Sequence, residues 1–456
     1  MTSRTATFRQ EFGPMLRLAW PMVLANLSWV TMGIVDTMMV GRVSPVAIGA
    51  VSLGGVVFFT VATFGYALLL GLDTLVPQAF GAGNLGDCRR SLVNSLYLCL
   101  PLGFILMAAV RLTERLLQAA GVNAAVLAQT IPYMRALDWS IPPLLVFAAF
   151  GGYLRGMNRV KPAMFAGLSA NLLNAGGDWI LIFGHGGFPR MGAEGSGWAT
   201  TLARIYMALV VLLYTLWHER RPASGAAAAP LSVDFSRIRR LVALGLPASL
   251  QTVVEVAVFA AATALVGKLN PTSLAAHQIA MQMATFTYMV PLGIASAAAV
   301  RVGQALGRAS PADARRSGWT ALALGAGFMG SAGLAFLLFP RLIARIFTPD
   351  EAVVRIGAAL LVVVAVFQLF DGIQTVVTGA LRGAGDTRTP MVCHFLAYWL
   401  IGLPLGYVLC FNFGMGVRGL WIGLSLALIL IGLALLFVWM RRVRTFQPTP
   451  LAATQE

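Results

Sequence analysis

The segment VPQAFGAGNLGDCRRS, residues 76–91, recurs 226 residues later as VGQALGRASPADARRS, residues 302–317. The same shift, without a gap, relates positions from Pro21 to Arg90 of the 456-residue chain to their counterparts in the second half. It pairs Pro21 with Pro247, Gly41 with Gly267, Ala50 with Ala276, Val76 with Val302, Gln78 with Gln304, Gly81 with Gly307, Asp87 with Asp313 and Arg90 with Arg316. The chain is therefore predicted to consist of two similar halves.

Composition places both halves in a membrane. Hydrophobic residues make up 58% of the chain and charged residues 11%, whereas soluble domains carry about 25% charged residues. Apolar runs long enough to span a bilayer occur at 14–38, 46–74, 91–113, 128–150, 162–184, 194–217, 238–268, 272–300, 317–339, 352–377, 390–411 and 416–440. Backbone groups in hydrocarbon must pair internally, so these runs are predicted to be helices.

The predicted fold is an all-α polytopic membrane protein with about twelve transmembrane helices in two six-helix repeats. Six spans return the chain to the side on which it started, so the repeats are parallel. Substrate sites in such transporters lie near the membrane midplane. We expect a cytoplasmic N-terminus at 1–13, an N-lobe at 14–217, a linker at 218–236, a C-lobe at 237–440 and a cytoplasmic tail at 441–456.

Basic residues set the expected orientation. With the N-terminus inside, the cytoplasmic segments hold 21 Lys and Arg residues and the opposite segments hold nine. By the positive-inside rule both termini are cytoplasmic, as in a multi-pass protein of a bacterial inner membrane. The net charge of +16 follows from these loops. No basic stripe is interleaved with aromatic residues, so the lipid bilayer is the expected partner and nucleic acid is not.

Several functional classes have no support in the sequence. The four cysteines match no zinc or redox spacing. We find no P-loop, no G-x-S-x-G and no H-E-x-x-H motif. An enzyme, a cofactor-dependent protein and an ATP-driven pump are therefore not expected, and an ion gradient remains as the energy source for active transport. A non-transport membrane protein such as a sensor is an alternative without a supporting motif.

Acidic residues inside the first-half spans are candidates for function, because each costs about 2.5–3.5 kcal/mol at a helix centre. Asp36 lies in the first span, and Asn171, Asn174 and Asp178 share one face of the fifth. Carboxylate and amide oxygens suit a hard cation such as sodium, or a proton. The alternative is polar contact between helices.

The second half has its own pair of acids. Glu255 follows Gln251 by one helical turn, and Asp371 is flanked by Gln368 and Gln374. The repeat alignment places Trp29 opposite Glu255 and Ala262 opposite Asp36. The acids thus differ between halves that share their prolines and glycines, which favours function over architecture.

Weaker candidates are expected to line a substrate cavity or to balance charge. Asp138 is expected to pair with Arg135, and Arg204 to neutralise a first-half acid. The cavity candidates from the residue pattern are Gln251, Gln278, Gln282, Phe286, Tyr288, Met289 and Gln368.

Several segments carry a family resemblance: VDTMMVGR, LDTLVPQAFGAG, GLPASLQTVVEV, VGQALGR, FDGIQTVVTGALRGAGDTRTP and GLWIGL. They resemble the multidrug and toxic compound extrusion (MATE) family, in particular its bacterial NorM-like branch. The resemblance covers nearly the whole chain, from about Gly13 to Arg444.

The resemblance implies two six-helix lobes around a central cavity that opens alternately to either side. It implies export of cationic and amphipathic compounds in exchange for sodium or protons, by a chain that works as a monomer. The family's cation-site positions correspond to Asp36, Asn174 and Asp178 in the N-lobe and to Glu255 and Asp371 in the C-lobe, with Thr201 a weaker match. Asp178 stands where NorM-like members often have Asn, so either lobe is a candidate for coupling. A lipid-linked oligosaccharide flippase of the same superfamily is the alternative.

Overall fold

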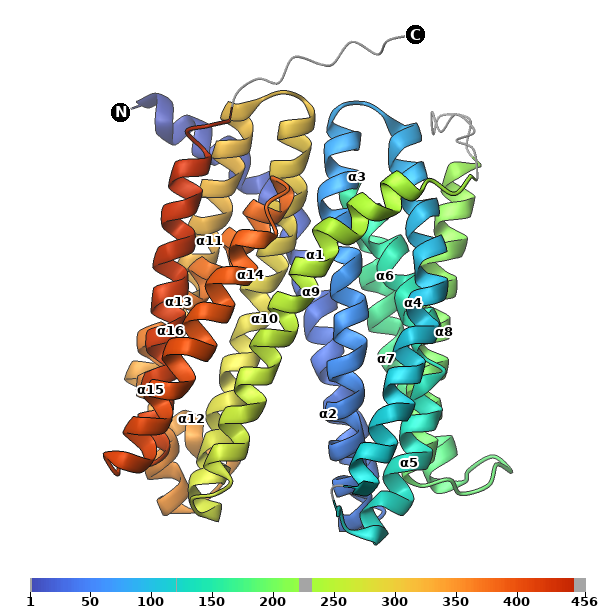
Figure 1. Cartoon of the computed structure of the whole chain (residues 1–456), viewed down its shortest axis with the longest axis vertical. Coiled ribbons are helices and arrows are strands. Elements are labelled where there is room, and N and C mark those ends of the chain that lie inside the picture. Colours follow the sequence, from blue (N-terminus) through green and yellow to red (C-terminus); the bar gives the residue numbers. More distant parts are fainter. Residues whose placement is uncertain (1, 120, 221–231, 447–456) are drawn as a thin grey trace. The chain divides into compact units, whose positions relative to one another are not determined.

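The computed structural model describes residues 2–119, 121–220 and 232–446. Every regular element in this part of the chain is helical (Figure 1). The first half contains α1 (Thr2–Val40), α2 (Pro45–Leu68), η1 (Leu69–Gly71), α3 (Leu72–Gly81), α4 (Leu85–Ala119), α5 (Ala124–Asp138), α6 (Ile141–Gly156), α7 (Lys161–Phe183) and α8 (Ala193–Glu219). The second contains α9 (Phe235–Val266), α10 (Pro271–Gly307), α11 (Pro311–Leu338), α12 (Pro340–Phe347), α13 (Glu351–Gly383), α14 (Arg388–Phe395), η3 (Leu396–Gly402), α15 (Leu403–Tyr407), η4 (Val408–Asn412) and α16 (Val417–Arg442).

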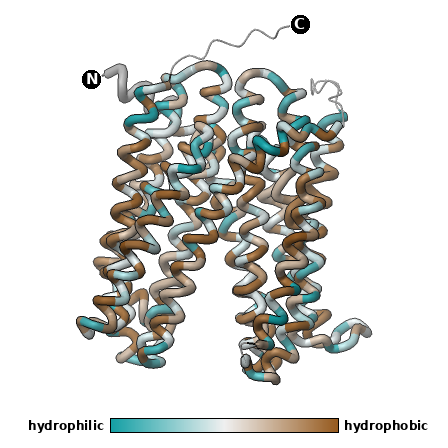
Figure 2. Tube along the Cα trace, viewed as in Figure 1, coloured by the Kyte–Doolittle hydropathy of each residue, from teal (hydrophilic) through white to brown (hydrophobic). Residues whose placement is uncertain are grey.

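The predicted fold class is confirmed, because a helix covers each of the twelve predicted spans. Ten helical segments in the described part of the chain are long and apolar enough to cross a membrane. The pair α5 and α6, bent by 42°, is an eleventh. Helix α7 has 23 residues but does not meet the same apolarity criterion, and it is the helix that carries Asn171, Asn174 and Asp178. Hydrophobic residues run along the helices and hydrophilic residues gather at their ends (Figure 2).

Repeat-related residues begin equivalent helices in the two halves. Ser44 accepts a hydrogen bond from the Ala47 amide at the start of α2, and Asn270 accepts one from the Ser273 amide at the start of α10. A proline follows each cap at the first helical position, where its missing N–H costs nothing. The sequence repeat is therefore a repeat of local structure.

Two compact units make up the chain, and each contains the beginning of the other half's first helix. One unit spans Leu24–Ser249, and the other joins the residues up to Val23 with those from Leu250 onward. The boundaries between the units lie inside α1 and α9, shortly after Pro21 and Pro247. These two boundaries are also related by the 226-residue shift. Of the expected linker at 218–236, residues 221–231 lie outside the described residues.

A buried ion pair holds the start of α1 to the second half. The Arg301 guanidinium on α10 donates to Glu11 through Nε (2.8 Å to Oε1) and through Nη2 (2.6 and 2.7 Å to Oε1 and Oε2). Ser317 on α11 donates to Glu11 Oε1 at 2.7 Å. This carboxylate is thus paired and hydrogen-bonded, as a buried charge must be.

At the equivalent contact in the other unit, the half's first helix supplies a basic residue in place of the acidic Glu11. Arg237, which the 226-residue shift relates to Glu11, begins α9 and donates to Ser91 Oγ at 2.9 Å. Its guanidinium also pairs with Asp87 on α4. Ser91 is related to Ser317 by the same shift. The repeat therefore conserves the place of the anchor while exchanging an acid for a base.

Close backbone packing continues from these anchors. A Cβ built on Gly245 of α9 would lie 1.8 Å from the Leu68 carbonyl oxygen, and one built on Gly293 of α10 would lie 2.7 Å from the Val23 nitrogen. Both distances are far below van der Waals contact. Glycine at these two positions lets α9 cross α2, and lets α1 cross α10, at backbone distance.

The expected pairing of Asp138 with Arg135 is wrong. Asp138 ends α5 with its side chain almost fully buried and pairs with Arg111 of α4 (3.0 Å, Arg111 Nε to Oδ2). Arg135 instead donates to Glu114 of α4 at 3.1 Å through Nη2. Each residue finds its partner on the neighbouring helix, because Arg135 is largely exposed while Asp138 turns inward before the bend into α6.

The α1 anchor generates a stability prediction. Arg301→Gln leaves the buried Glu11 carboxylate without its counterion, so we expect a loss of about 3 kcal/mol of unfolding free energy. Thermal unfolding of the purified protein in detergent measures this as a lower melting temperature. Glu11→Gln combined with Arg301→Gln is expected to recover part of the loss. Arg315→Gln, at an exposed position on α11, is the control, and equal melting temperatures for the two arginine variants would contradict the assignment.

Candidate cation-binding sites

Four carboxyl groups inside the helices stand apart from the other acids. None of the ion pairs formed by described residues includes Asp36, Asp178, Glu255 or Asp371. By contrast Asp73, which is fully buried, pairs with Arg155 at 3.1 Å. A buried carboxylate without a counterion is costly. The four acids are therefore the candidates for taking up positive charge.

Asp36 and Asp178 lie together in the first half. Thr200 of α8 donates to Asp36 Oδ2 at 3.1 Å, and the Asn174 amide of α7 approaches Thr200 Oγ1 at 3.4 Å. Asp178 is one helical turn beyond Asn174 and interacts electrostatically with Asp36. Three helices, α1, α7 and α8, thus place two carboxyls, an amide and a hydroxyl around one point.

The oxygens of this cluster have unused capacity. Asp36 Oδ1, Asn174 Oδ1 and both carboxylate oxygens of Asp178 are buried and have no hydrogen-bond partner among the described residues. Two negative charges side by side in an apolar interior repel each other and lack solvation. The arrangement is stable only with a proton or a bound cation, and its oxygen donors suit a hard cation such as sodium.

Arg204 lies near this cluster without pairing to it. Its Nη1 donates to Ser140 Oγ at 2.6 Å, and its guanidinium lies over the rings of Phe58 and Trp29, 4.9 and 5.8 Å from their centroids. It exerts a favourable electrostatic effect on Asp36, in line with the expected charge balance. The guanidinium of Arg204 interacts with the two aromatic rings and with Ser140 and not directly with the carboxyls. It therefore offsets part of their negative charge from a distance.

Two residues that the sequence suggested for this cluster, Asn171 and Thr201, form their hydrogen bonds outside it. Asn171 donates to the Ser28 carbonyl at 3.1 Å and also hydrogen-bonds the Ser28 hydroxyl, so it links α7 to α1. Thr201 donates to the Ala136 carbonyl at 2.7 Å. Its neighbour Thr200 is the residue that reaches Asp36. The sequence did not single out Thr200. Neighbouring helical residues point about 100° apart, and the loop before α8 leaves the alignment of that helix uncertain by one residue.

In the second half, Asp371 is the centre of a network along α13. The Gln374 amide donates to Asp371 Oδ1 at 3.0 Å and to Thr375 Oγ1 at 3.1 Å. Thr375 in turn donates to the Asp371 backbone carbonyl at 2.7 Å. Asp371 is also the charged neighbour of Glu255, which α9 places half-buried nearby. The two acids predicted from sequence therefore share one electrostatic environment.

His394 extends this network and was not predicted from the sequence. Its Nε2 lies 2.8 Å from Gln374 Oε1, and its Nδ1 lies 2.7 Å from the Pro390 carbonyl. Gln251 Nε2 is 3.4 Å from the same ring. The clue in the sequence that could have pointed to His394 is a histidine within an apolar run. The π-helical turn η3 begins two residues later, and such turns are frequent at functional sites.

The hydrogen-bond pattern links His394 to Asp371. Both ring nitrogens face carbonyl oxygens, yet a neutral imidazole has only one N–H to donate. Either the ring carries two protons, or the Gln374 amide is reversed and its oxygen faces Asp371, which must then hold a proton to donate. Amide orientation is assigned from such networks. The extra proton lies on His394 in the first arrangement and on Asp371 in the second, so the two groups are linked through Gln374.

The cavity candidates on α10 separate into two groups. Gln278, Gln282 and Phe286 follow one another at four-residue spacing and are exposed. Tyr288 and Met289 are half-buried, and Tyr288 interacts electrostatically with Glu255 and Asp371. Gln368 is buried and donates to Thr287 Oγ1 at 2.5 Å, so it fastens α13 to α10.

Comparison with known proteins places this arrangement in a family. The MatE family model matches the chain twice, at residues 21–180 and 247–408, one match in each half. The chain is 36% identical to "Probable multidrug resistance protein NorM" of Mesorhizobium japonicum, with 97% of this chain and 96% of the relative covered. It is 34% identical to "Multidrug resistance protein PmpM" of Pseudomonas aeruginosa, with 93% and 90% covered.

Solved structures share the fold. The crystal structure of the eukaryotic MATE transporter AtDTX14 matches with a TM-score of 0.83 at 21% identity, covering 96% of this chain and 99% of that one. A crystal structure of MATE in complex with MaD3S matches with a TM-score of 0.87 at 20% identity, covering 96% and 97%.

The crowded carboxyls of the first half generate a prediction. Asp178→Asn removes one of two adjacent buried carboxyls without changing the shape of the side chain. We expect the melting temperature in detergent at pH 8, without added sodium, to rise by about 2 °C or more. Asn174→Asp adds a third carboxyl at the same place and is the matched opposite change, expected to lower the melting temperature. Equal effects of the two variants would show that the carboxyls do not interact.

Proposed function

This chain belongs to the MatE family, and we propose that it is a secondary multidrug exporter that moves cationic and amphipathic organic compounds in exchange for sodium ions or protons. The names of its relatives, several called multidrug resistance proteins, support the substrate class. It is a multi-pass membrane protein of a transporter family, and enzymatic activity is not part of the proposal.

One observation carries the proposal: each half holds two carboxyls inside its helices without an ion pair among the described residues. A cationic drug and a coupling ion can both neutralise such a group, but they compete for it. Binding of the ion then favours release of the drug, which is the linkage that an antiporter requires. Alternation between the two sides of the membrane turns this competition into export.

The remaining sequence expectations belong to the same proposal. The protein lies in the bacterial inner membrane with both termini in the cytoplasm, on the basis of the Lys and Arg bias. Its lobes are residues 14–217 and 237–440, and one chain suffices for transport. The cation-coupling residues are Asp36, Asn174 and Asp178 in the N-lobe and Glu255 and Asp371 in the C-lobe.

The C-lobe acids provide the direct test. Asp371→Asn and Glu255→Gln keep the size of each side chain but remove its ability to ionise, so we expect both variants to lose dye export in proteoliposomes. Ethidium efflux is followed by fluorescence, with sodium and proton gradients imposed separately. Glu351→Gln, at an exposed position where α13 begins, is the control. Wild-type efflux by both C-lobe variants, at equal reconstitution, would rule out these residues as the coupling site.

His394 gives a second test through its effect on pH dependence. His394→Phe removes both ring hydrogen bonds while keeping an aromatic ring, so Gln374 loses the partner that fixes its amide. We expect the pH profile of proton-driven ethidium efflux to shift while sodium-driven efflux, if present, changes less. His185→Phe, on the loop after α7, is the matched control. An unchanged pH profile for His394→Phe would show that the ring is only a packing element.

A further inference from the structure

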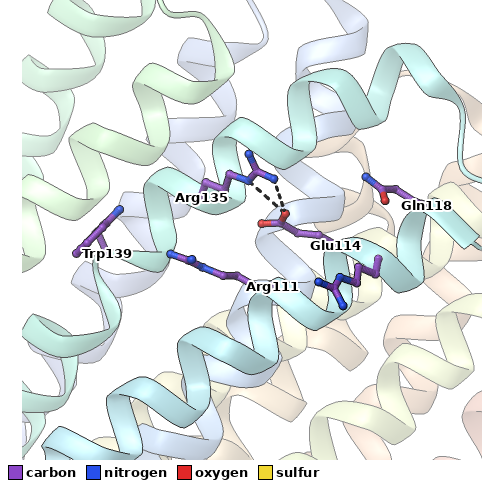
Figure 3. Close-up of a pocket in the computed structure, with 6 residues that line it drawn as sticks. Arg111, Glu114, Gln118, Arg135 and Trp139 are labelled. Atoms are coloured by element: carbon purple, nitrogen blue, oxygen red, sulfur yellow. Dashed lines mark hydrogen bonds and ion pairs between the residues drawn. The ribbon is translucent and has the colours of Figure 1, made fainter.

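A cavity on the first-half unit is lined by charged side chains that the proposed transport does not use. It has a volume of about 450 Å³ between α4 and α5 and is lined by Arg111, Glu114, Arg115, Gln118, Arg135 and Trp139 (Figure 3). The α4 residues recur at spacings of three and four, so they lie on one face of that helix. Arg135 and Trp139, four residues apart, form the opposite wall.

The charges of this cavity do not balance. Arg135 pairs with Glu114, and Arg111 pairs with the buried Asp138. Arg115 is exposed and forms no hydrogen bond or ion pair with any described residue. One guanidinium is therefore left over. Such a group is well suited to a phosphate, which it can bind through two parallel hydrogen bonds.

The cavity also contains a carboxylate oxygen of Glu114 that accepts no hydrogen bond from a described residue. Both hydrogen bonds from Arg135 go to Oε2 of Glu114. The other oxygen, Oε1, is buried and has no hydrogen-bond partner in the described part of the chain. The phosphodiester of a phospholipid cannot satisfy it, because it offers only acceptors. A ligand that fits both features needs a phosphate for Arg115, a hydrogen-bond donor for Glu114 and a net negative charge to match the guanidinium left over.

The surface next to the cavity is apolar. Leu100, Phe104, Ile105, Leu112 and Leu116 of α4 have exposed fractions of 64%, 73%, 64%, 56% and 60%. These side chains form a stripe along the same helix, with Arg111 and Arg115 near its end. Apolar stripes of this kind in a membrane protein face acyl chains. A ligand with a phosphate head and hydrocarbon tails would cover the cavity and the stripe together.

The depth of the cavity agrees with a lipid headgroup. Arg90 and Arg111 are 21 residues apart on α4, which is about 32 Å along a helix. The hydrocarbon core is about 30 Å thick. If Arg90 lies at one headgroup layer, Arg111 and Arg115 lie at the other. Trp139, with 55% of its surface exposed, is the residue type that concentrates at this level.

We propose that the cavity between α4 and α5 binds the headgroup of phosphatidylglycerol, an anionic phospholipid whose headgroup carries hydroxyls. The phosphate accepts hydrogen bonds from Arg115, and a glycerol hydroxyl donates to Glu114 Oε1. The acyl chains lie along the apolar stripe of α4. On the orientation proposed above this is the outer leaflet, but binding itself does not depend on the transport proposal.

The test compares lipids on the purified full chain. Thermal stabilisation in detergent is titrated with phosphatidylglycerol, phosphatidylethanolamine, phosphatidylcholine and inorganic phosphate. For the wild type we expect stabilisation by phosphatidylglycerol above that by the other two lipids, and none by phosphate alone. Arg115→Gln is expected to bind phosphatidylglycerol about tenfold more weakly. Arg115→Lys, which keeps the charge, is expected to retain part of the affinity.

Arg190→Gln provides the matched control, since Arg190 is an exposed arginine of the same unit on the loop between α7 and α8. Its phosphatidylglycerol titration should match the wild type. The lipid-free melting temperature of Arg115→Gln should also be unchanged, because the side chain has no partner among the described residues. Equal phosphatidylglycerol affinity for Arg115→Gln and the wild type would overturn the proposal. Equal stabilisation by phosphatidylcholine, by phosphatidylethanolamine or by phosphate alone would overturn it as well.

Discussion

A charged side chain is stable inside an apolar helix bundle only when something neutralises it. This constraint accounts for the placement of several buried acids in the described part of the chain. Glu11 has Arg301 and Ser317, Asp73 has Arg155, and Asp138 has Arg111. Asp36, Asp178, Glu255 and Asp371 are the exceptions, with no ion pair among the described residues. Because these three acids are neutralised within the fold, we propose that the four without an ion pair among the described residues exchange charge with the surroundings.

The repeat preserves the helix caps and helix contacts described above, and it differs in chemistry. Ser44 and Asn270 cap equivalent helices, and the two compact units divide at equivalent residues. At the anchors, however, Glu11 in one half corresponds to Arg237 in the other. The acids inside the helices have no equivalents in the opposite half. The helix caps and helix contacts that packing requires recur in both halves, whereas the acids do not recur because packing does not demand a carboxyl.

The two candidate sites differ in how they can hold positive charge. The Asp36 and Asp178 cluster has several unpartnered oxygens around one point, an arrangement that suits a directly bound cation. Asp371 instead belongs to a continuous chain through Gln374 to His394, an arrangement that suits a shared proton. The resemblance to MATE proteins led us to expect two candidate lobes for coupling. The side-chain networks add a chemical difference between them.

The sequence by itself determined the membrane environment, the twelve helical segments, the two-half repeat and the family. Each of these depends on local composition or on direct similarity along the chain, and the structure and comparisons confirm them. It also identified the four unpaired acids, since a carboxyl in an apolar run is visible without coordinates. Only the tertiary structure decided that Asp138 pairs with Arg111, that Thr200 reaches Asp36 and that Gln374 links His394 to Asp371. It also decided that Arg115 has no partner among the described residues. These contacts join residues of different helices, and helix rotation and crossing fix them. A linear pattern cannot specify that geometry, because a shift of one residue turns a side chain through 100°.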